Sequence, residues 1–122
     1  MSVPKLNLLI PQGTTFSRAL QVIVAGVATN LTTPINNTFR GMIRTSYEAV
    51  APLLSFTFTK SGDNLTVTWS LTDTQTATLP ATQDKDGADA TDPLVYDIER
   101  VYGGQVDRVL QGQIRVTPEA TK

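Results

Sequence analysis

Two groups of carboxylates are the residues of this chain whose spacing could serve chemistry. Residues 84–89 (Asp-Lys-Asp-Gly-Ala-Asp) carry three carboxylates in six positions, and Ca²⁺ requires several oxygen ligands. The segment lacks the third alternating ligand before the glycine and the bidentate glutamate of an EF-hand loop. It is interpreted as a solvated connector, or as a loop that only a neighbouring subunit orders, and no metal site is predicted.

The second group is Asp97 and Glu99, two positions apart in a segment with strand periodicity. Their carboxylates therefore share one face, as a catalytic acid–base pair would require. Arg100, Arg108 and Arg115 are candidate partners on adjacent strands, where opposite charges stabilise each other. Cross-strand ion pairs are the preferred interpretation, because a glycosidase-type pair needs a cleft lined by aromatic and polar groups, and the few aromatic residues are mostly assigned to the core. No enzymatic activity is predicted.

Composition excludes several further classes of function. Histidine and cysteine are absent, which rules out Ser-His-Asp and Cys-His catalysis and zinc sites built on either residue type. Ten basic and eleven acidic residues are spread along the chain without a basic cluster, so no nucleic-acid partner is predicted. No apolar run approaches the roughly 20 residues of a membrane helix, and no signal peptide is recognised at the start. Neither a membrane partner nor a cofactor is predicted.

Alternation of apolar and polar residues predicts strands over most of the chain. The clearest segments are residues 14–24, 39–44, 54–59, 65–71, 94–99 and 106–116, with residues 5–10 as an edge strand or docking arm. Between strands, Thr72 and Gln75 fit a capping box that begins one or two helical turns ending at Pro80. The pattern predicts an all-β fold, an antiparallel immunoglobulin-like β-sandwich of about seven strands with one short helical turn. Residues 1–11 form an N-terminal arm or edge strand, and residues 12–122 form the sandwich domain.

Aromatic residues of the predicted hairpin 54–71 are assigned to the core. Phe56, Phe58 and Trp69 alternate strictly with Thr and Ser, which favours burial over a carbohydrate-stacking platform. In the last strand Gly112 would permit a bulge or a close backbone approach. That strand is predicted to bury Val106, Leu110, Ile114 and Val116.

Four segments together resemble a family of tailed-bacteriophage β-sandwich proteins that includes collar and long-tail-fibre attachment subunits. They are residues 12–16 (QGTTF), 71–80 (LTDTQTATLP), 96–99 (YDIE) and 108–112 (RVLQG) running into 116–119 (VTPE). The resemblance covers roughly residues 12–121; the long loop 81–93 and the arm 2–10 depart from it. It implies a non-enzymatic virion protein at the phage tail, made in the host cytoplasm. Its expected partners are copies of itself, in a ring or another symmetric assembly, and other phage tail or fibre proteins.

Subunit contacts are predicted at the arm, at the long loop, at the C-terminal tail and at Arg18. Arg18 interrupts an apolar face, and it either is buried with a carboxylate partner at a subunit contact or lies at a sheet edge. Two other functions stay open, a capsid decoration protein and a glycan-binding module that uses an exposed aromatic such as Tyr47 or Tyr102. The predicted contact residues are Leu6, Leu8, Ile10, Arg18, Asp86, Asp89, Pro118 and Glu119.

Overall fold

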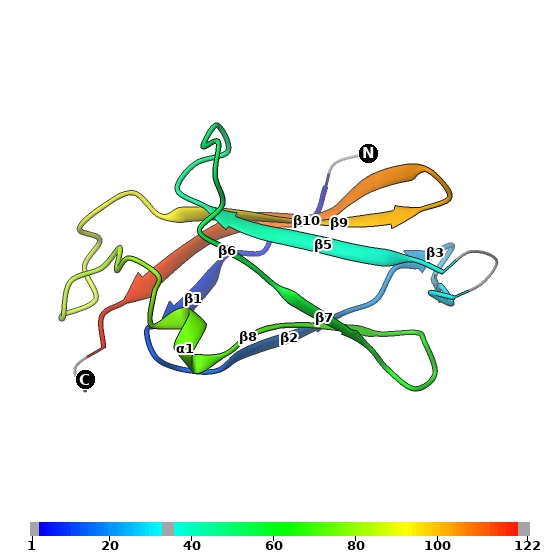
Figure 1. Cartoon of the computed structure of the whole chain (residues 1–122), viewed down its shortest axis with the longest axis horizontal. Coiled ribbons are helices and arrows are strands. Elements are labelled where there is room, and N and C mark those ends of the chain that lie inside the picture. Colours follow the sequence, from blue (N-terminus) through cyan, green and yellow to red (C-terminus); the bar gives the residue numbers. More distant parts are fainter. Residues whose placement is uncertain (1–2, 33–35, 120–122) are drawn as a thin grey trace.

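Two β-sheets lie in layers over a shared core in the computed structural model, which describes residues 3–32 and 36–119 (Figure 1). One sheet has five strands in the order β1-β10-β9-β5-β6, the other three in the order β2-β8-β7, and β3 and β4 form a small separate hairpin. The prediction of an all-β chain is confirmed. The strands are β1 (Leu8–Pro11), β2 (Phe16–Leu20), β3 (Ile23–Val24), β4 (Val27–Ala28), β5 (Thr38–Arg44), β6 (Leu54–Ser55), β7 (Thr57–Lys60), β8 (Val67–Leu71), β9 (Leu94–Tyr102) and β10 (Gln105–Thr117).

The pairing of β1 departs from the purely antiparallel arrangement that the sequence predicted. β1 runs parallel to the end of β10, with Leu8 opposite Ile114 and Pro11 opposite Thr117, whereas the other strand pairs are antiparallel. Residues 8–11 of the predicted arm are thus an edge strand of the larger sheet. Because side chains alternate across a strand, Leu8 and Ile10 point into the core and Leu9 points outward.

The chain crosses between the layers in the middle of a segment predicted as one strand, 54–59. Leu54 and Ser55 of β6 pair with β5 in the larger sheet, while β7 pairs with β8 in the smaller one. Phe56 lies at the crossing, where its N–H donates to Gly41 O at 2.9 Å and its ring is buried. Figure 1 shows this crossing between β6 and β7, and a second one where β1 leads into β2.

The predicted capping box is confirmed and begins α1 (Asp73–Thr76), the one helix among the described residues. Gln75 N donates to Thr72 Oγ1 at 3.1 Å, and Thr72 N donates to Gln75 Oε1 at 2.9 Å, so two of the donors at the helix start are satisfied. Asp73 in the first turn carries the charge that the positive end of a helix favours.

Aromatic rings fill the space between the sheets. Phe16, Phe56, Trp69 and Tyr96 are buried, and their ring centroids lie 5.1–6.1 Å apart. Such tilted and offset pairs add to the stability that burial itself gives. Phe58 is half-buried and stacks on Phe39 at 5.9 Å. The assignment of the hairpin aromatics to the core is confirmed.

A bulge corrects the prediction that Val106 faces the core. The register of β9 and β10 shifts between Arg108 and Leu110, which leaves Val109 as an extra residue. One inserted residue inverts the alternation of side chains, so Val106 is 47% exposed while Ile114 and Val116 beyond the bulge are fully buried. Leu110 is partly buried against the core.

Candidate functional site

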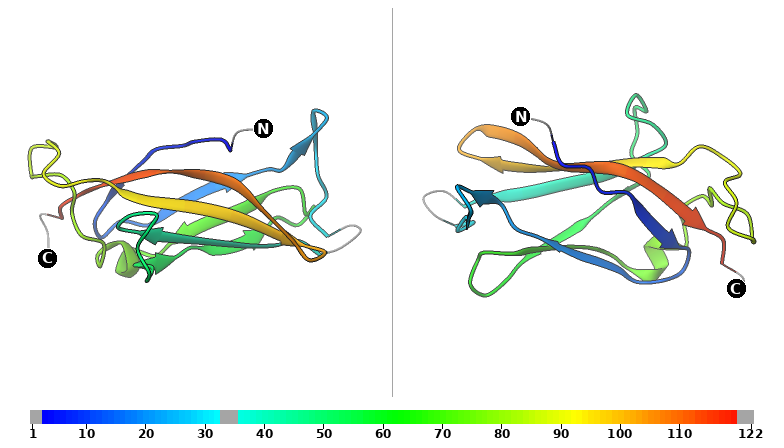
Figure 2. Two further views of the ribbon diagram at one scale, coloured as in Figure 1. Left: turned by 90° about the horizontal axis from the view of Figure 1, so that it is seen from above. Right: turned by 180° about the vertical axis from the view of Figure 1, so that it is seen from behind.

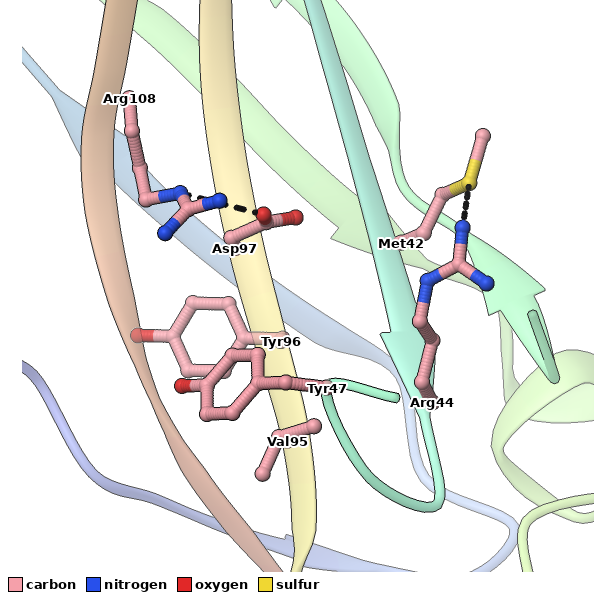
Figure 3. Close-up of a pocket in the computed structure, with 7 residues that line it drawn as sticks. All are labelled: Met42, Arg44, Tyr47, Val95, Tyr96, Asp97 and Arg108. Carbon is pink, nitrogen blue, oxygen red and sulfur yellow. Dashed lines mark hydrogen bonds and ion pairs between the residues drawn. The ribbon is translucent and has the colours of Figure 1, made fainter. Parts of the chain in front are cut away.

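A shallow pocket lined by charged and polar residues lies on the outer face of the larger sheet. It lies over β5, β9 and β10, beside the loop 45–53, and encloses about 150 Å³ (Figure 3). Four of its side chains carry polar or charged groups that face solvent: Arg44, Tyr47, Asp97 and Arg108. The other lining residues are Met42, Val95 and Tyr96.

Cross-strand ion pairs occupy both carboxylates that the sequence singled out. Arg108 Nε lies 3.3 Å from Asp97 Oδ2, the kind of pair that the sequence predicted. Glu99 pairs instead with Arg40 at 2.7 Å, on the strand at its other side. All these side chains are partly exposed, so each pair contributes no more than about 1 kcal/mol.

The other two arginines considered as partners of Asp97 and Glu99 lie elsewhere. Arg100 donates to Asn37 Oδ1, and its guanidinium lies 3.8 Å over the ring of Tyr102. Arg115 pairs with Asp89 at 3.2 Å, which ties the long loop to β10. Opposite charges are therefore distributed along the sheet face instead of being concentrated around Asp97 and Glu99.

Arg44 organises the loop that borders the pocket. Its Nη1 donates to Ala49 O at 3.0 Å and to Val50 O at 3.1 Å, so the guanidinium closes the loop onto the end of β5. Tyr47 is 55% exposed, and its hydroxyl donates to Gly112 O at 3.4 Å. Sequence reasoning named Tyr47 as an exposed aromatic but missed Arg44, because binding to loop carbonyls leaves no mark in residue types or spacing.

The long loop 81–93 is fastened by contacts within the chain. Asp84 Oδ1 accepts from Asp86 N at 2.9 Å and from Ala88 N at 3.0 Å, which closes a turn. Thr82 N donates to Val116 O, and Thr82 Oγ1 accepts from Val116 N at 2.9 Å. Within residues 3–32 and 36–119, no three Asp or Glu side chains gather as metal ligands would. Asp86 is exposed, whereas Asp89 is engaged with Arg115.

The predicted contact residues lie on separate parts of the molecule. Leu8 and Ile10 are buried in the core of this chain, whereas Leu6 is 42% exposed. Pro118 is exposed, and Glu119 packs over Gly13 with its N–H donating to Gln12 Oε1 at 3.0 Å. Residues 120–122 lie outside the described residues.

Arg18 lies at a sheet edge of this chain, and its predicted subunit contact stays a prediction. Arg18 is exposed on β2, an edge strand of the smaller sheet. Its Nη1 donates to Ser17 O, and its guanidinium lies 4.9 Å over the ring of Phe16. Cation–π contacts of this kind are worth about 0.5–1 kcal/mol at exposed sites.

Comparison with models of known protein families and with curated proteins finds no match to this chain. No helix in the described part of the chain is long and apolar enough to cross a membrane.

Proposed function

We propose that this chain is a structural virion protein of a tailed bacteriophage, an adaptor or collar subunit at the tail or at the fibre attachment point. In this proposal the two layers form an immunoglobulin-like β-sandwich that acts as a rigid unit. Its function is to pack against copies of itself and against neighbouring tail or fibre proteins. Exposed strand edges are surfaces on which chains pair, and a repeated contact around an axis closes a ring.

The observation that carries the proposal is that the segments bearing the resemblance contact one another. Gln12, in the first segment, donates from Nε2 to Leu79 O of the second at 2.7 Å. Its backbone N–H donates to Thr117 O of the fourth at 3.0 Å, and Glu119 N donates to Gln12 Oε1. Thr76 Oγ1 also donates to Thr14 O at 2.7 Å. Residues 62–107 positions apart therefore form one junction at an end of the sandwich.

The third segment joins the fourth through the centre of the larger sheet. Tyr96 lies opposite Gly112 in the register of β9 and β10. The Tyr96 hydroxyl reaches past Gly112 to the N-terminal segment, where it donates to Leu6 O at 2.6 Å. All four segments therefore belong to one connected part of the fold, as a rigid adaptor subunit would require.

Immunogold labelling of purified phage particles tests this proposal. Antibody raised against the purified chain should label the tail or collar of the phage whose genome encodes it. Label on the head would favour the capsid decoration protein, and particles that contain none of this chain by mass spectrometry would refute a virion role.

The exposed Tyr47 beside the Asp97–Arg108 pair favours a second candidate, a glycan-binding module. An aromatic ring next to paired polar groups offers both stacking and hydrogen bonding to a sugar. Binding to isolated bacterial surface polysaccharide should then be lost in Tyr47→Ala. It should be kept in Tyr102→Ala, because the ring of Tyr102 stacks with Arg100 away from the pocket. Failure of the wild-type chain to bind any polysaccharide of the host would remove this candidate.

A further inference from the structure

The edge of β10 that faces away from β9 is paired with the N-terminal segment over only part of its length. Lys5 bridges to Gln111, and β1 then covers the edge as far as Thr117. Gln111 donates to Pro4 O at 3.1 Å and accepts from Leu6 N at 2.9 Å, and Gln113 N donates to Asn7 Oδ1. No strand of the described chain lies on this edge from Gln105 to Val109 (Figure 2).

Where no strand of the described chain pairs with it, the edge directs backbone groups away from β9. Tyr102 and Gln105 flank the Gly103-Gly104 turn, and such a pair exchanges both of its backbone hydrogen bonds. Because hydrogen-bonded and non-bonded pairs alternate, Val106 and Arg108 point their N–H and C=O away from β9. They are the counterparts of Gln111 and Gln113, whose outward groups bind the N-terminal segment.

An apolar groove opens beside this edge. It lies between the bulge of β10 and the chain that leads from β2 to β3, and it encloses about 480 Å³. The exposed side chains of Val24 and Val27, 61% and 68% accessible, lie on the adjoining β3–β4 hairpin. The groove is lined by Val3, Pro4, Leu20, Gln21, Val22, Ile23, Arg108, Val109 and Leu110.

We propose that this edge and groove bind an extended segment of a different protein, which pairs with β10 at Val106 and Arg108. Strand addition supplies backbone partners, while alternate side chains of the added strand enter pockets beside the edge. The fitting partner therefore has apolar residues at every second position, because the lining of the groove is mainly apolar. The site continues the slot that β1 already fills along the same edge.

Charge distinguishes a foreign segment from a second copy of this edge. Two β10 edges related by a two-fold axis pair antiparallel, with residues of the same sheet face opposite each other. The register that overlaps the free segment most fully pairs Val106 with Arg108 and places Asp107 opposite Asp107. Like charges directly opposite each other destabilise a strand pair, so self-pairing is disfavoured. This inference does not depend on the proposed virion role.

The test uses the full chain labelled with ¹⁵N and a capped peptide, acetyl-Lys-Val-Thr-Val-Thr-Val-Lys-amide. Saturable shifts should appear at the amides of Val106, Arg108 and the groove residues. Val106→Pro removes one outward donor at a position where an edge strand tolerates proline. It should weaken binding about tenfold, as expected for one lost backbone hydrogen bond, whereas the matched Val106→Thr should bind like the wild type.

A second peptide tests the same backbone hydrogen bonds on the wild-type chain, so its result does not depend on whether Val106→Pro folds. The same sequence with N-methylated valines cannot donate to the edge, so it should not bind the wild-type chain. No shifts at millimolar peptide, shifts that map elsewhere, or equal affinities of both peptides would each overturn the proposal. A concentration-dependent dimer that Val106→Pro abolishes in sedimentation would assign the edge to a second copy and also overturn it.

Discussion

The hydroxyl of Tyr96 donates a 2.6 Å hydrogen bond to the carbonyl oxygen of Leu6, ninety positions earlier in the chain. Gly112 makes room for this contact, because a Cβ on that residue would lie 2.0 Å from the same oxygen. The Leu6 carbonyl is therefore held against β9 and β10 in the space that a side chain at Gly112 would occupy. The sequence indicated a bulge or a close approach at Gly112, and the structure shows the close approach.

Gly112→Ala should detach the N-terminal segment from the sheet. The added methyl group meets backbone that cannot rotate away, and overpacking of this kind costs about 1–3 kcal/mol. Urea unfolding should show that loss, and hydrogen exchange should show faster exchange at Leu6 and Gln111. Gly62→Ala is the control, since nothing lies within 4 Å of its Cβ position. Equal stability of the two variants would contradict this account of Gly112.

Tyr96→Phe should lower the free energy of unfolding by about 0.5–1.5 kcal/mol, the usual net contribution of a hydrogen bond. Burial is the main cause that raises the pKa of the Tyr96 phenol above its ordinary value of 10.0, and the nearby Tyr47 adds to it. A raised folded-state pKa gives stability that is complete below the unfolded pKa and declines as pH rises above it. The wild type should thus lose its advantage over Tyr96→Phe above about pH 10. A constant difference between the two proteins across that range would exclude the phenol as the cause.

Thr72→Ala should destabilise the chain by about 1 kcal/mol through loss of the N-cap. Thr72 Oγ1 accepts from Gln75 N, whereas the side chain of Thr74, on the same helix, is exposed and does not cap it. Thr74→Ala is therefore the matched control. Thermal unfolding followed by circular dichroism compares the variants, and the cap account fails if both lower the midpoint equally.

Asp63 should titrate below the ordinary range of an aspartate. Ser61 Oγ donates to its carboxylate at 2.5 Å and Leu65 N at 3.1 Å, and these bonds lower the pKa of Asp63, Ser61 being the larger cause. A lowered pKa gives stability that is present above the unfolded pKa of 3.8 and is lost as pH falls through the folded one. Carboxyl NMR titration should show the Asp63 pKa return toward its ordinary value in Ser61→Ala. No change in that variant would rule out the hydroxyl as the main cause.

Local signals made part of this fold predictable. The capping box depends on residues three positions apart, so it could be predicted from the sequence. The bulge at Val109 was not predicted, because an inserted residue can be recognised only against the partner strand. Missing the insertion reverses the predicted facing of every residue of β10 that precedes it.

Features that join distant residues were missed for a related reason. Apolar and polar residues alternate without a break through the crossing at Phe56. The sequence pattern therefore cannot distinguish one continuous strand from two strands that lie in different sheets. The polar pocket was not predicted, although three of the residues that line it were named for other reasons. Asp97, Arg108 and Tyr47 had been named, whereas Arg44 acts through loop carbonyls whose position depends on the fold.

The parallel pairing of β1 with β10 also determines how the molecule bears load. A force that pulls Val3 and Glu119 apart along the strands draws β1 and β10 in opposite directions. The backbone hydrogen bonds between Leu8–Pro11 and the end of β10 then resist together in shear, instead of opening one after another. Tension applied between Val3 and Glu119 is therefore carried by this strand pair in shear.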